Sequence, residues 1–171
     1  AHRRGVAVRL VADSDALDGT QLARVQSAGI PVIGDRREGL MHNKFMVVDS
    51  ALLWTGSLNL TGSGTYNDNN NMARILSPDL AQNYSVEFEE MFANDQFGAG
   101  SPADTPNPRV TLPGGAVVEN YFSPDDNISP RLVDLRHSAE PVADHPRPPH
   151  ITPEALHDIP QRAGHGAGRP S

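Results

Sequence analysis

The chain has 171 residues, enough for one medium-sized domain or for a domain with a tail. Its formal net charge of −7 and its pI of about 5.4 argue against a broad basic surface for nucleic acid or anionic lipid. It contains no cysteine, which excludes disulfides and thiolate metal sites, and no apolar run approaches the ~20 residues of a membrane helix.

Hydrophobic patterning and turn residues predict alternating strands and helices over the first hundred residues. In chain order we expect a strand at 5–12, a helix at 16–28, strands at 30–33, 44–49 and 52–56, a polar loop at 61–69, a strand at 71–76, a helix at 77–92, a strand at 117–122 and a helix from 129 to about 138. A helix that feeds a strand through Ala-Gly-Ile-Pro-Val is typical of a parallel crossover. The pattern predicts an α/β fold, a layered α/β/α sandwich around a mixed sheet.

The helix at 77–92 has the clearest signals. Ser77 is the expected N-cap, with Pro78 in the first turn. Apolar residues four apart predict its buried side: Leu80, Tyr84, Phe88 and Phe92. Its glutamates are expected on the solvent side: Glu87, Glu89 and Glu90.

Composition divides the chain into four parts. Residues 1–100 are expected to form the domain, with an incomplete N-terminus because the opening residues resemble the last turn of a helix. Residues 101–116 are expected to be a linker, and 117–140 the possible start of a second repeat. Thirteen of fifteen prolines follow Ser101, and five of seven histidines follow Arg136. Residues 141–171 are therefore expected to be an irregular, disordered Pro/Gly/His-rich tail.

One constellation carries chemistry, and it contains the only lysine of the chain. The pattern is H-x-K-x4-D-x6-G-S-x-N, formed by His42, Lys44, Asp49, Gly56, Ser57 and Asn59. Six specified residues at fixed spacing arise by chance at about one site in 20⁶. A hairpin of 44–49 with 52–56 brings an imidazole, an ammonium, a hydroxyl and a carboxamide to one mouth, which suits a phosphodiester. Gly56 gives the backbone room at the turn.

These residues resemble the HKD signature of the phospholipase D superfamily, and the resemblance extends from residue 5 to 97. It implies a phospholipase D-like half-domain and a two-step phosphodiester exchange that needs no metal or cofactor. His42 would be the nucleophile, forming a phosphohistidine, or the acid for the leaving group. Lys44 and Asn59 would bind phosphate with support from Ser57, and Asp49 would complete the catalytic motif in a mostly structural role.

The sequence departs from the family pattern in two places. Single-motif nucleases of the family place a Glu after the long loop, where it orients the motif His; Asn70 occupies that place here. An amide orients an imidazole less strongly than a carboxylate, which argues mildly against the nuclease subgroup. The family also needs two motifs per active site. The single Lys44 means that the second comes from missing sequence or from a homodimer.

Three functions follow from these observations. The leading hypothesis is a phosphodiesterase or phosphatidyltransferase acting on phospholipid head groups, which fit the acidic balance better than nucleic acid. The alternatives are a metal-independent endonuclease acting as a homodimer, and a catalytically inactive structural half-domain. The sequence leaves the cellular compartment open.

Overall fold

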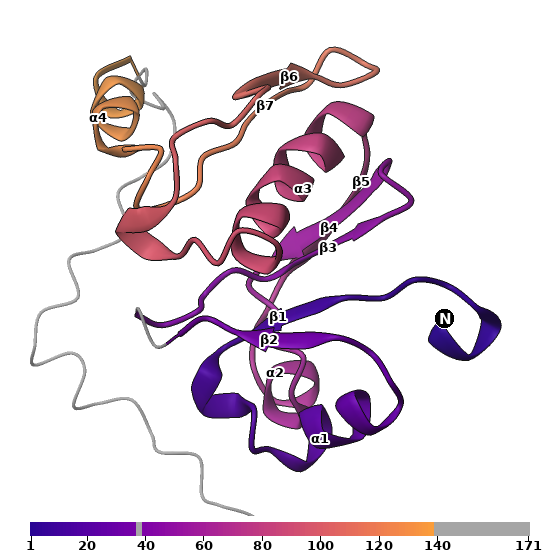
Figure 1. Ribbon diagram of the computed structural model, residues 1–171. Coiled ribbons are helices and arrows are strands. Elements are labelled where there is room, and N and C mark those ends of the chain that lie inside the picture. Colours follow the sequence, from indigo (N-terminus) through magenta and orange to yellow (C-terminus); the bar gives the residue numbers. More distant parts are fainter. Residues whose placement is uncertain (37–38, 139–171) are drawn as a thin grey trace, which may run out of the picture. The chain divides into compact units, whose positions relative to one another are not determined.

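The computed structural model describes residues 1–36 and 39–138 (Figure 1). By internal contacts the chain divides into two compact units, Ala1–Asp134 and Leu135–Ser171, and the second is described only up to Ser138. The tail expected at 141–171 lies outside the described residues. The site discussed below lies entirely in the first unit.

The described residues contain both helices and strands, interspersed along the chain, which confirms the predicted α/β class. In chain order the elements are β1 (Leu10–Ala12), α1 (Thr20–Ser27), β2 (Val32–Gly34), β3 (Phe45–Val48), β4 (Leu52–Gly56), α2 (Gly62–Tyr66), β5 (Met72–Leu76), α3 (Pro78–Phe92), β6 (Arg109–Thr111), β7 (Val117–Glu119) and α4 (Ser129–Ser138). Short 3₁₀ helices lie at His2–Arg4, Ser14–Ala16 and Gly98–Gly100.

The described strands form three separate sheets, whereas the patterning predicts one continuous mixed sheet. β1 and β2 pair in parallel, with α1 between them in the chain. β3, β4 and β5 form an antiparallel sheet in which Phe45 faces Thr55 and Gly56 faces Met72. β6 and β7 form an antiparallel hairpin. α3 packs on β1, β3 and β4. In the described residues the parallel pair and the antiparallel sheet are therefore connected by packing against the same helix and not by a strand ladder.

The helices cover both sides of the strands, as the layered fold predicts. α3 packs on one side, and Figure 1 shows α1 and α2 on the other. α1 is shorter than predicted because residues 14–16 form a 3₁₀ turn first, capped by Asp13, and Gly19 then becomes the N-cap of α1. Gly29 follows the helix at φ 82°, a left-handed conformation that ends helices at little cost for glycine.

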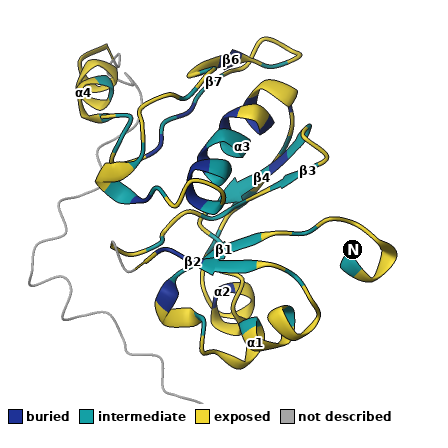
Figure 2. Cartoon of the chain, in the orientation of Figure 1, coloured by how far each residue is buried: buried dark blue, intermediate teal, exposed yellow. Residues whose placement is uncertain are grey.

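The core joins the antiparallel sheet, α3 and the late hairpin. Leu53, Leu80 and Val110 are buried together, and these partly buried residues pack against them: Phe45, Val47, Ile75, Tyr84, Leu112 and Val118. Buried residues are concentrated on α3 in Figure 2. Residues 101–116, expected as a linker, thus contain β6 and supply a core side chain. The assignment of 117–140 to a second repeat stays a prediction.

The N-terminus of α3 confirms its predicted cap. Ser77 Oγ accepts a hydrogen bond from the backbone N–H of Leu80 at 3.3 Å. The expected solvent position is wrong for two of the three glutamates, because Glu87 is 7% exposed and Glu90 is 5% exposed. Both lie three or four residues from other buried positions of α3, so the helix presents them toward the protein.

The predicted aromatic side of α3 is divided between two environments. Tyr84 packs edge-on against Phe45 with ring centroids 5.0 Å apart, inside the core. Phe88 and Phe92 instead stack on each other, and the Arg9 guanidinium lies 5.0 Å from each ring centroid. Cation–π attraction therefore ties the residue before β1 to the second half of α3.

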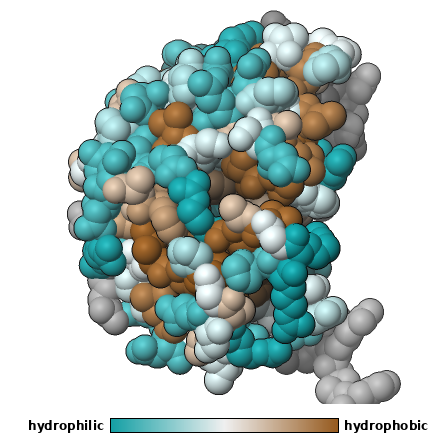
Figure 3. Space-filling model, turned by 45° about the vertical axis from the view of Figure 1, so that its right-hand side comes forward, coloured by the Kyte–Doolittle hydropathy of each residue, from teal (hydrophilic) through white to brown (hydrophobic). Residues whose placement is uncertain are grey.

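The surface carries exposed apolar area. Figure 3 shows apolar side chains gathered along a hollow of one face. A cavity of about 350 Å³ is lined by the segment before β1 together with Pro31. Val6 in that segment is 43% exposed, because the described ladder of β1 starts only at Leu10 and leaves residues 5–9 outside it.

Candidate active site

The motif residues 42–44 lead directly into β3, at the end of its ladder with β4. The backbone N–H of Gly56 donates to the carbonyl of Lys44 at 3.4 Å, one position beyond the Phe45–Thr55 pair. Lys44 therefore lies opposite Gly56 across the hairpin. His42 is exposed and Lys44 is half-buried. The structure thus brings the H-x-K segment beside the G-S-x-N segment, as the spacing predicts.

The ammonium of Lys44 lies at this mouth. Lys44 Nζ donates a hydrogen bond to the backbone carbonyl of His42 at 2.8 Å. An ammonium has three donors, so two hydrogens of Lys44 remain for other acceptors at the same place. A cationic donor beside the motif imidazole suits an anionic oxygen of a substrate.

Gly56 is required by the close approach of β5. A Cβ at this position would contact the backbone oxygen of Asn71 and come within 2.9 Å of Met72 Cα. Backbone atoms cannot yield as a flexible side chain can, so any larger residue would separate β4 from β5. The glycine therefore allows the three strands to meet where the motif side chains emerge.

Ser57 is held by the two residues that immediately precede β5. Its hydroxyl donates to Asn70 Oδ1 at 3.0 Å and accepts from the backbone N–H of Asn71 at 3.0 Å. Its own backbone N–H donates to the carbonyl of Asn71 at 3.0 Å. Because the hydroxyl proton is directed at Asn70, Ser57 must release that bond before it can donate to a phosphate.

Asn70 connects Ser57 to the segment that was predicted to be a polar loop, residues 61–69. Its amide Nδ2 donates to the carbonyl of Gly64 at 2.9 Å, while its Oδ1 accepts from Ser57. Gly64 lies in α2, the short helix within the predicted polar loop, and the α2 N-cap Thr61 accepts from the backbone N–H of Gly64 at 3.0 Å. Asn70 therefore orients Ser57 and α2 in this structure, whereas the resemblance predicts a contact with His42.

Asn59 lies on the exposed segment between β4 and α2. A Cβ at Gly64 would meet its backbone oxygen and lie 3.0 Å from its Cβ, so the helix closely approaches the segment. The side chain is exposed. Asn59 is thus in close contact with Gly64 of α2 and remains accessible to a ligand from the solvent.

Asp49 is the one motif residue that the structure does not bring to this mouth. It follows β3, whereas His42 precedes it, so the two lie at opposite ends of the strand. Asp49 and Ser50 both have φ 52°, and the backbone N–H of Ala51 donates to the Val48 carbonyl at 3.2 Å, so they are the two central residues of a turn with left-handed backbone. Asp is tolerated there better than most residues, which accounts for its place in the hairpin as a turn residue.

Glu87, which the motif pattern does not predict, contacts the motif segment from α3. Asn43, between His42 and Lys44, donates through Nδ2 to Glu87 Oε1 at 3.2 Å. Burial, and then the negative charge of Asp125, raise the pKa of Glu87 to about 7, although the bond from Asn43 opposes the shift. The signal was the spacing of Glu87 from buried Asn83 and Leu80, which places it on the inner side of α3.

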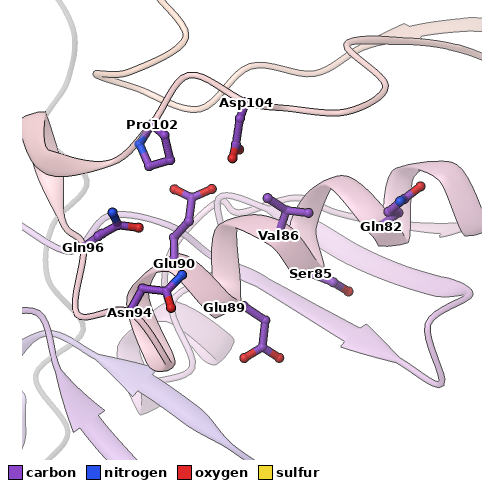
Figure 4. A pocket seen from close by; sticks show the side chains of 9 residues that line it. All are labelled: Gln82, Ser85, Val86, Glu89, Glu90, Asn94, Gln96, Pro102 and Asp104. Atoms are coloured by element: carbon purple, nitrogen blue, oxygen red, sulfur yellow. The ribbon is translucent and has the colours of Figure 1, made fainter.

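A second buried carboxyl lies one turn further along α3. Glu90 and Asp104 both line a cavity of about 300 Å³ between α3 and the segment that follows it (Figure 4). Burial raises the pKa of Glu90, and its hydrogen bond to Asp104 raises it further because the bond favours the protonated form. Glu90 on α3 and Asp104 on the following segment thus lie at the same cavity, and the Glu90 carboxyl is the one whose pKa is raised.

Two further classes of site are not found in the part of the chain that the structure describes. Its His, Asp and Glu side chains form no group of three or more that could hold a metal ion. Among the same residues, no helix has both the length and the apolar character needed to cross a membrane.

Comparison with known proteins gives the family. The sequence family described as "Cardiolipin synthase, PLD-like domain" matches residues 1–92. The mitochondrial cardiolipin hydrolase of Homo sapiens is 40% identical over 98 residues, which are 56% of this chain and 38% of that protein. The corresponding protein of Xenopus tropicalis is 39% identical over 93 residues, 53% of this chain and 44% of its own length.

A bacterial relative and a solved structure agree with this match. A phospholipase D of Rickettsia conorii is 34% identical over 86 residues, 49% of this chain and 43% of that protein. The crystal structure of Nuc from Salmonella typhimurium, a phospholipase D family member, aligns with a TM-score of 0.50 at 26% identity, over 54% of this chain and 64% of that one. The chain spans about two fifths of the length of these curated relatives.

The family match covers more than half of the chain and includes the whole motif, from His42 to Asn59, with β5 and α3. The mixed α/β fold agrees with that of the solved family member. The chain belongs to the cardiolipin synthase, PLD-like domain family of the phospholipase D superfamily.

Proposed function

We propose that the chain supplies one half of a phosphodiesterase active site, with His42 and Lys44 as its reactive pair. The observation that carries the proposal is the convergence of the H-x-K and G-S-x-N segments at one end of the β3–β4 hairpin, through the bond between Gly56 and Lys44. Membership of the superfamily supports the interpretation of these two segments as half of a phosphodiesterase site.

The proposed chemistry proceeds in two steps. A neutral imidazole nitrogen of His42 attacks phosphorus, the N–P bond forms, and the P–O bond to the leaving alcohol breaks as a second imidazole protonates that oxygen. Water or another alcohol then attacks phosphorus, gives its proton to the second imidazole and releases His42. Lys44 and Asn59 bind the non-bridging oxygens, whose negative charge grows as the bonds exchange.

The second imidazole must come from outside the single motif of this sequence. We propose either a second copy of the chain or a second motif elsewhere in a longer protein. In a homodimer each site needs His42 from both copies. In mixtures of the wild-type chain with His42→Asn at constant total concentration, activity would then follow the square of the wild-type fraction. A linear dependence, or a strict monomer in light scattering, rejects the homodimer.

The proposed substrate is a phospholipid. The support is the name of the relatives from Xenopus tropicalis and Homo sapiens, mitochondrial cardiolipin hydrolase, which states a phospholipid substrate for those proteins. The test incubates the chain with cardiolipin vesicles, phosphatidylcholine vesicles and labelled single-stranded DNA, each in EDTA. Release of a lipid head group or phosphatidic acid, lost in His42→Asn, supports the proposal.

Two other results would overturn parts of it. Cleavage of DNA alone would replace the lipid substrate by a nuclease function. No turnover of any substrate, by the chain alone and by a longer version of it, would leave an inactive structural half-domain. Activity that requires an added metal ion would contradict the phosphohistidine route.

A further inference from the structure

The central residue of the H-x-K segment is attached to α3. Asn43 Nδ2 lies 3.2 Å from Glu87 Oε1, and Glu87 is 7% exposed in the middle of the helix. α3 also packs directly on β3, the strand that this segment enters. The contact therefore connects a well-packed helix to a segment whose flanking residue His42 is exposed.

The position of Asn43 explains why a bond there would affect its neighbours. Lys44 is held to the hairpin by the Gly56 N–H at its carbonyl, and its Nζ donates to the His42 carbonyl, so Asn43 lies between two residues that are bonded to each other. Fixing Asn43 against the helix limits rotation of the segment about its own axis. The directions of the imidazole and the ammonium are thereby limited without any group touching them.

We infer that Glu87 is a positioning residue, which holds His42 and Lys44 in register through Asn43 and holds them more firmly when its carboxyl is ionised. An ionised acceptor forms the shorter and stronger hydrogen bond with an amide donor. The inference rests on the proposed function for its catalytic meaning, but the attachment itself is a property of the folded chain.

The surroundings of Glu87 make its ionisation sensitive to pH near neutrality. The carboxyl groups that act on it come from three segments: Glu90 on α3, Asp104 after that helix, and Asp125 and Asp126 before α4. Burial, and then the negative charges of Asp125, Asp126 and Asp104, raise the pKa of Glu87 to about 7, while the bond from Asn43 lowers it. Since that bond favours the charged form, ionisation and a firm hold on Asn43 occur together.

The first experiment needs no catalytic activity. In a His42→Asn background, which removes the titration of the motif imidazole, the Asn43 side-chain amide is followed by ¹H–¹⁵N NMR from pH 5 to 9. We expect its resonances to move with a midpoint near the Glu87 pKa of about 7. The movement should disappear when Glu87→Gln is added, since Gln keeps an acceptor for Asn43 but does not titrate.

The matched control is Glu89→Gln, on the same helix. Glu89 pairs with Arg9 and has no bond to the motif segment, so this variant should retain the Asn43 titration. An Asn43 amide that does not respond to pH, or that responds equally with Glu87→Gln, overturns the inference, whatever the chain catalyses.

The second experiment uses whichever substrate is turned over. In the wild-type chain and in Glu89→Gln we expect kcat to rise between pH 6 and 8 as Glu87 ionises. Glu87→Gln should retain activity but lack the part of this rise that comes from Glu87. Asn43→Ala, which removes the attachment, should lower kcat by about tenfold or more with a smaller change in KM. Equal pH profiles for the two glutamine variants reject the positioning role. Failure to find any turnover rejects only the proposed function, because the NMR result stands separately.

Discussion

At the scale of single residues, Lys44 already has a partner before any substrate arrives. Its ammonium donates to the His42 carbonyl at 2.8 Å, so a phosphate oxygen would replace a neutral acceptor by a charged one. The sequence predicted this neighbourhood of His42, Lys44 and Ser57 from residue spacing alone. It did not predict the link from Asn43 to Glu87, because a glutamate close to two others in a helix is ordinarily assigned to the solvent-exposed side, and its burial becomes known only from the structure.

Gly56 gives a residue-scale prediction about stability. Gly56→Ala should destabilise the chain by about 2 kcal/mol, because the new methyl meets backbone of Asn71 and Met72, and displacing backbone in a packed region costs roughly 1–3 kcal/mol. Urea unfolding followed by circular dichroism measures the change. Gly62→Ala is the control, since a Cβ there meets nothing within 4 Å, and equal stability of the two variants would contradict the close approach.

Asn70 gives a second prediction at this scale. Asn70→Asp should retain the acceptor for Ser57 but set a carboxylate against the Gly64 carbonyl, at a cost of about 1–2 kcal/mol at pH 7. Protonation of the new carboxyl should recover much of the loss near pH 4. Thermal unfolding at both pH values tests this, with the exposed neighbour Asn69→Asp as control. A loss that does not depend on pH would be inconsistent with the proposed geometry.

At the scale of elements, the strands of the motif hairpin were predicted closely and the segments around them less well. Residues 61–69 contain α2 because Thr61 caps it and Gly64 allows close packing against Asn59, although Gly, Ser and Thr are poor helix formers. β6 was read as linker because its surroundings are rich in Pro. Tertiary contacts decide both cases, and local composition does not contain them.

α3 gives the prediction at this scale, and its sign follows from burial. The pKa of Glu87 in the folded chain is about 7, above the ordinary 4.5, so the folded state binds more protons and its stability falls as pH rises from about 4.5 to 7. Glu87→Gln should remove that decline and stabilise the chain at pH 8 by roughly 1–3 kcal/mol. Denaturant midpoints between pH 5 and 8 measure it.

Glu89 supplies a control of opposite sign on the same helix. Its hydrogen bond to Arg9 lowers the pKa of Glu89 below the ordinary value, so its contribution to stability is present at neutral pH and is lost in acid. Glu89→Gln should therefore slightly weaken the chain at pH 7 and leave the decline between pH 5 and 7 intact. If both variants flatten that decline, Glu87 is not its source.

At the scale of the whole molecule, the α/β class followed from periodicity, but the division into sheets did not. Parallel and antiparallel strands were assigned to one sheet because nothing in the spacing of β2 and β3 excludes a ladder. In the described residues α3 joins them, since it packs on both groups. The buried Val110 shows likewise that the core extends past residue 100, where composition alone suggested a boundary.

Val110 gives the prediction at this scale. Val110→Ala should cost about 2 kcal/mol by loss of buried methyl groups next to Leu53 and Leu80, within one cooperative transition of the motif sheet and the hairpin. Val117→Ala on the same hairpin, at a side chain 46% exposed, should change stability little. Separate transitions, or equal effects of the two variants, would show that the hairpin is not part of this core.

The late position of Val110 in the chain has a consequence for synthesis on the ribosome. The motif strands and α3 are complete by Phe92, but their core needs Val110 and Val118 from the hairpin. At ~5–20 residues per second, about 26 further residues take roughly 1–5 s to be added. During that interval the nascent chain exposes the apolar surface around Leu53 and Leu80, where a chaperone would act before the motif is enclosed in its final packing.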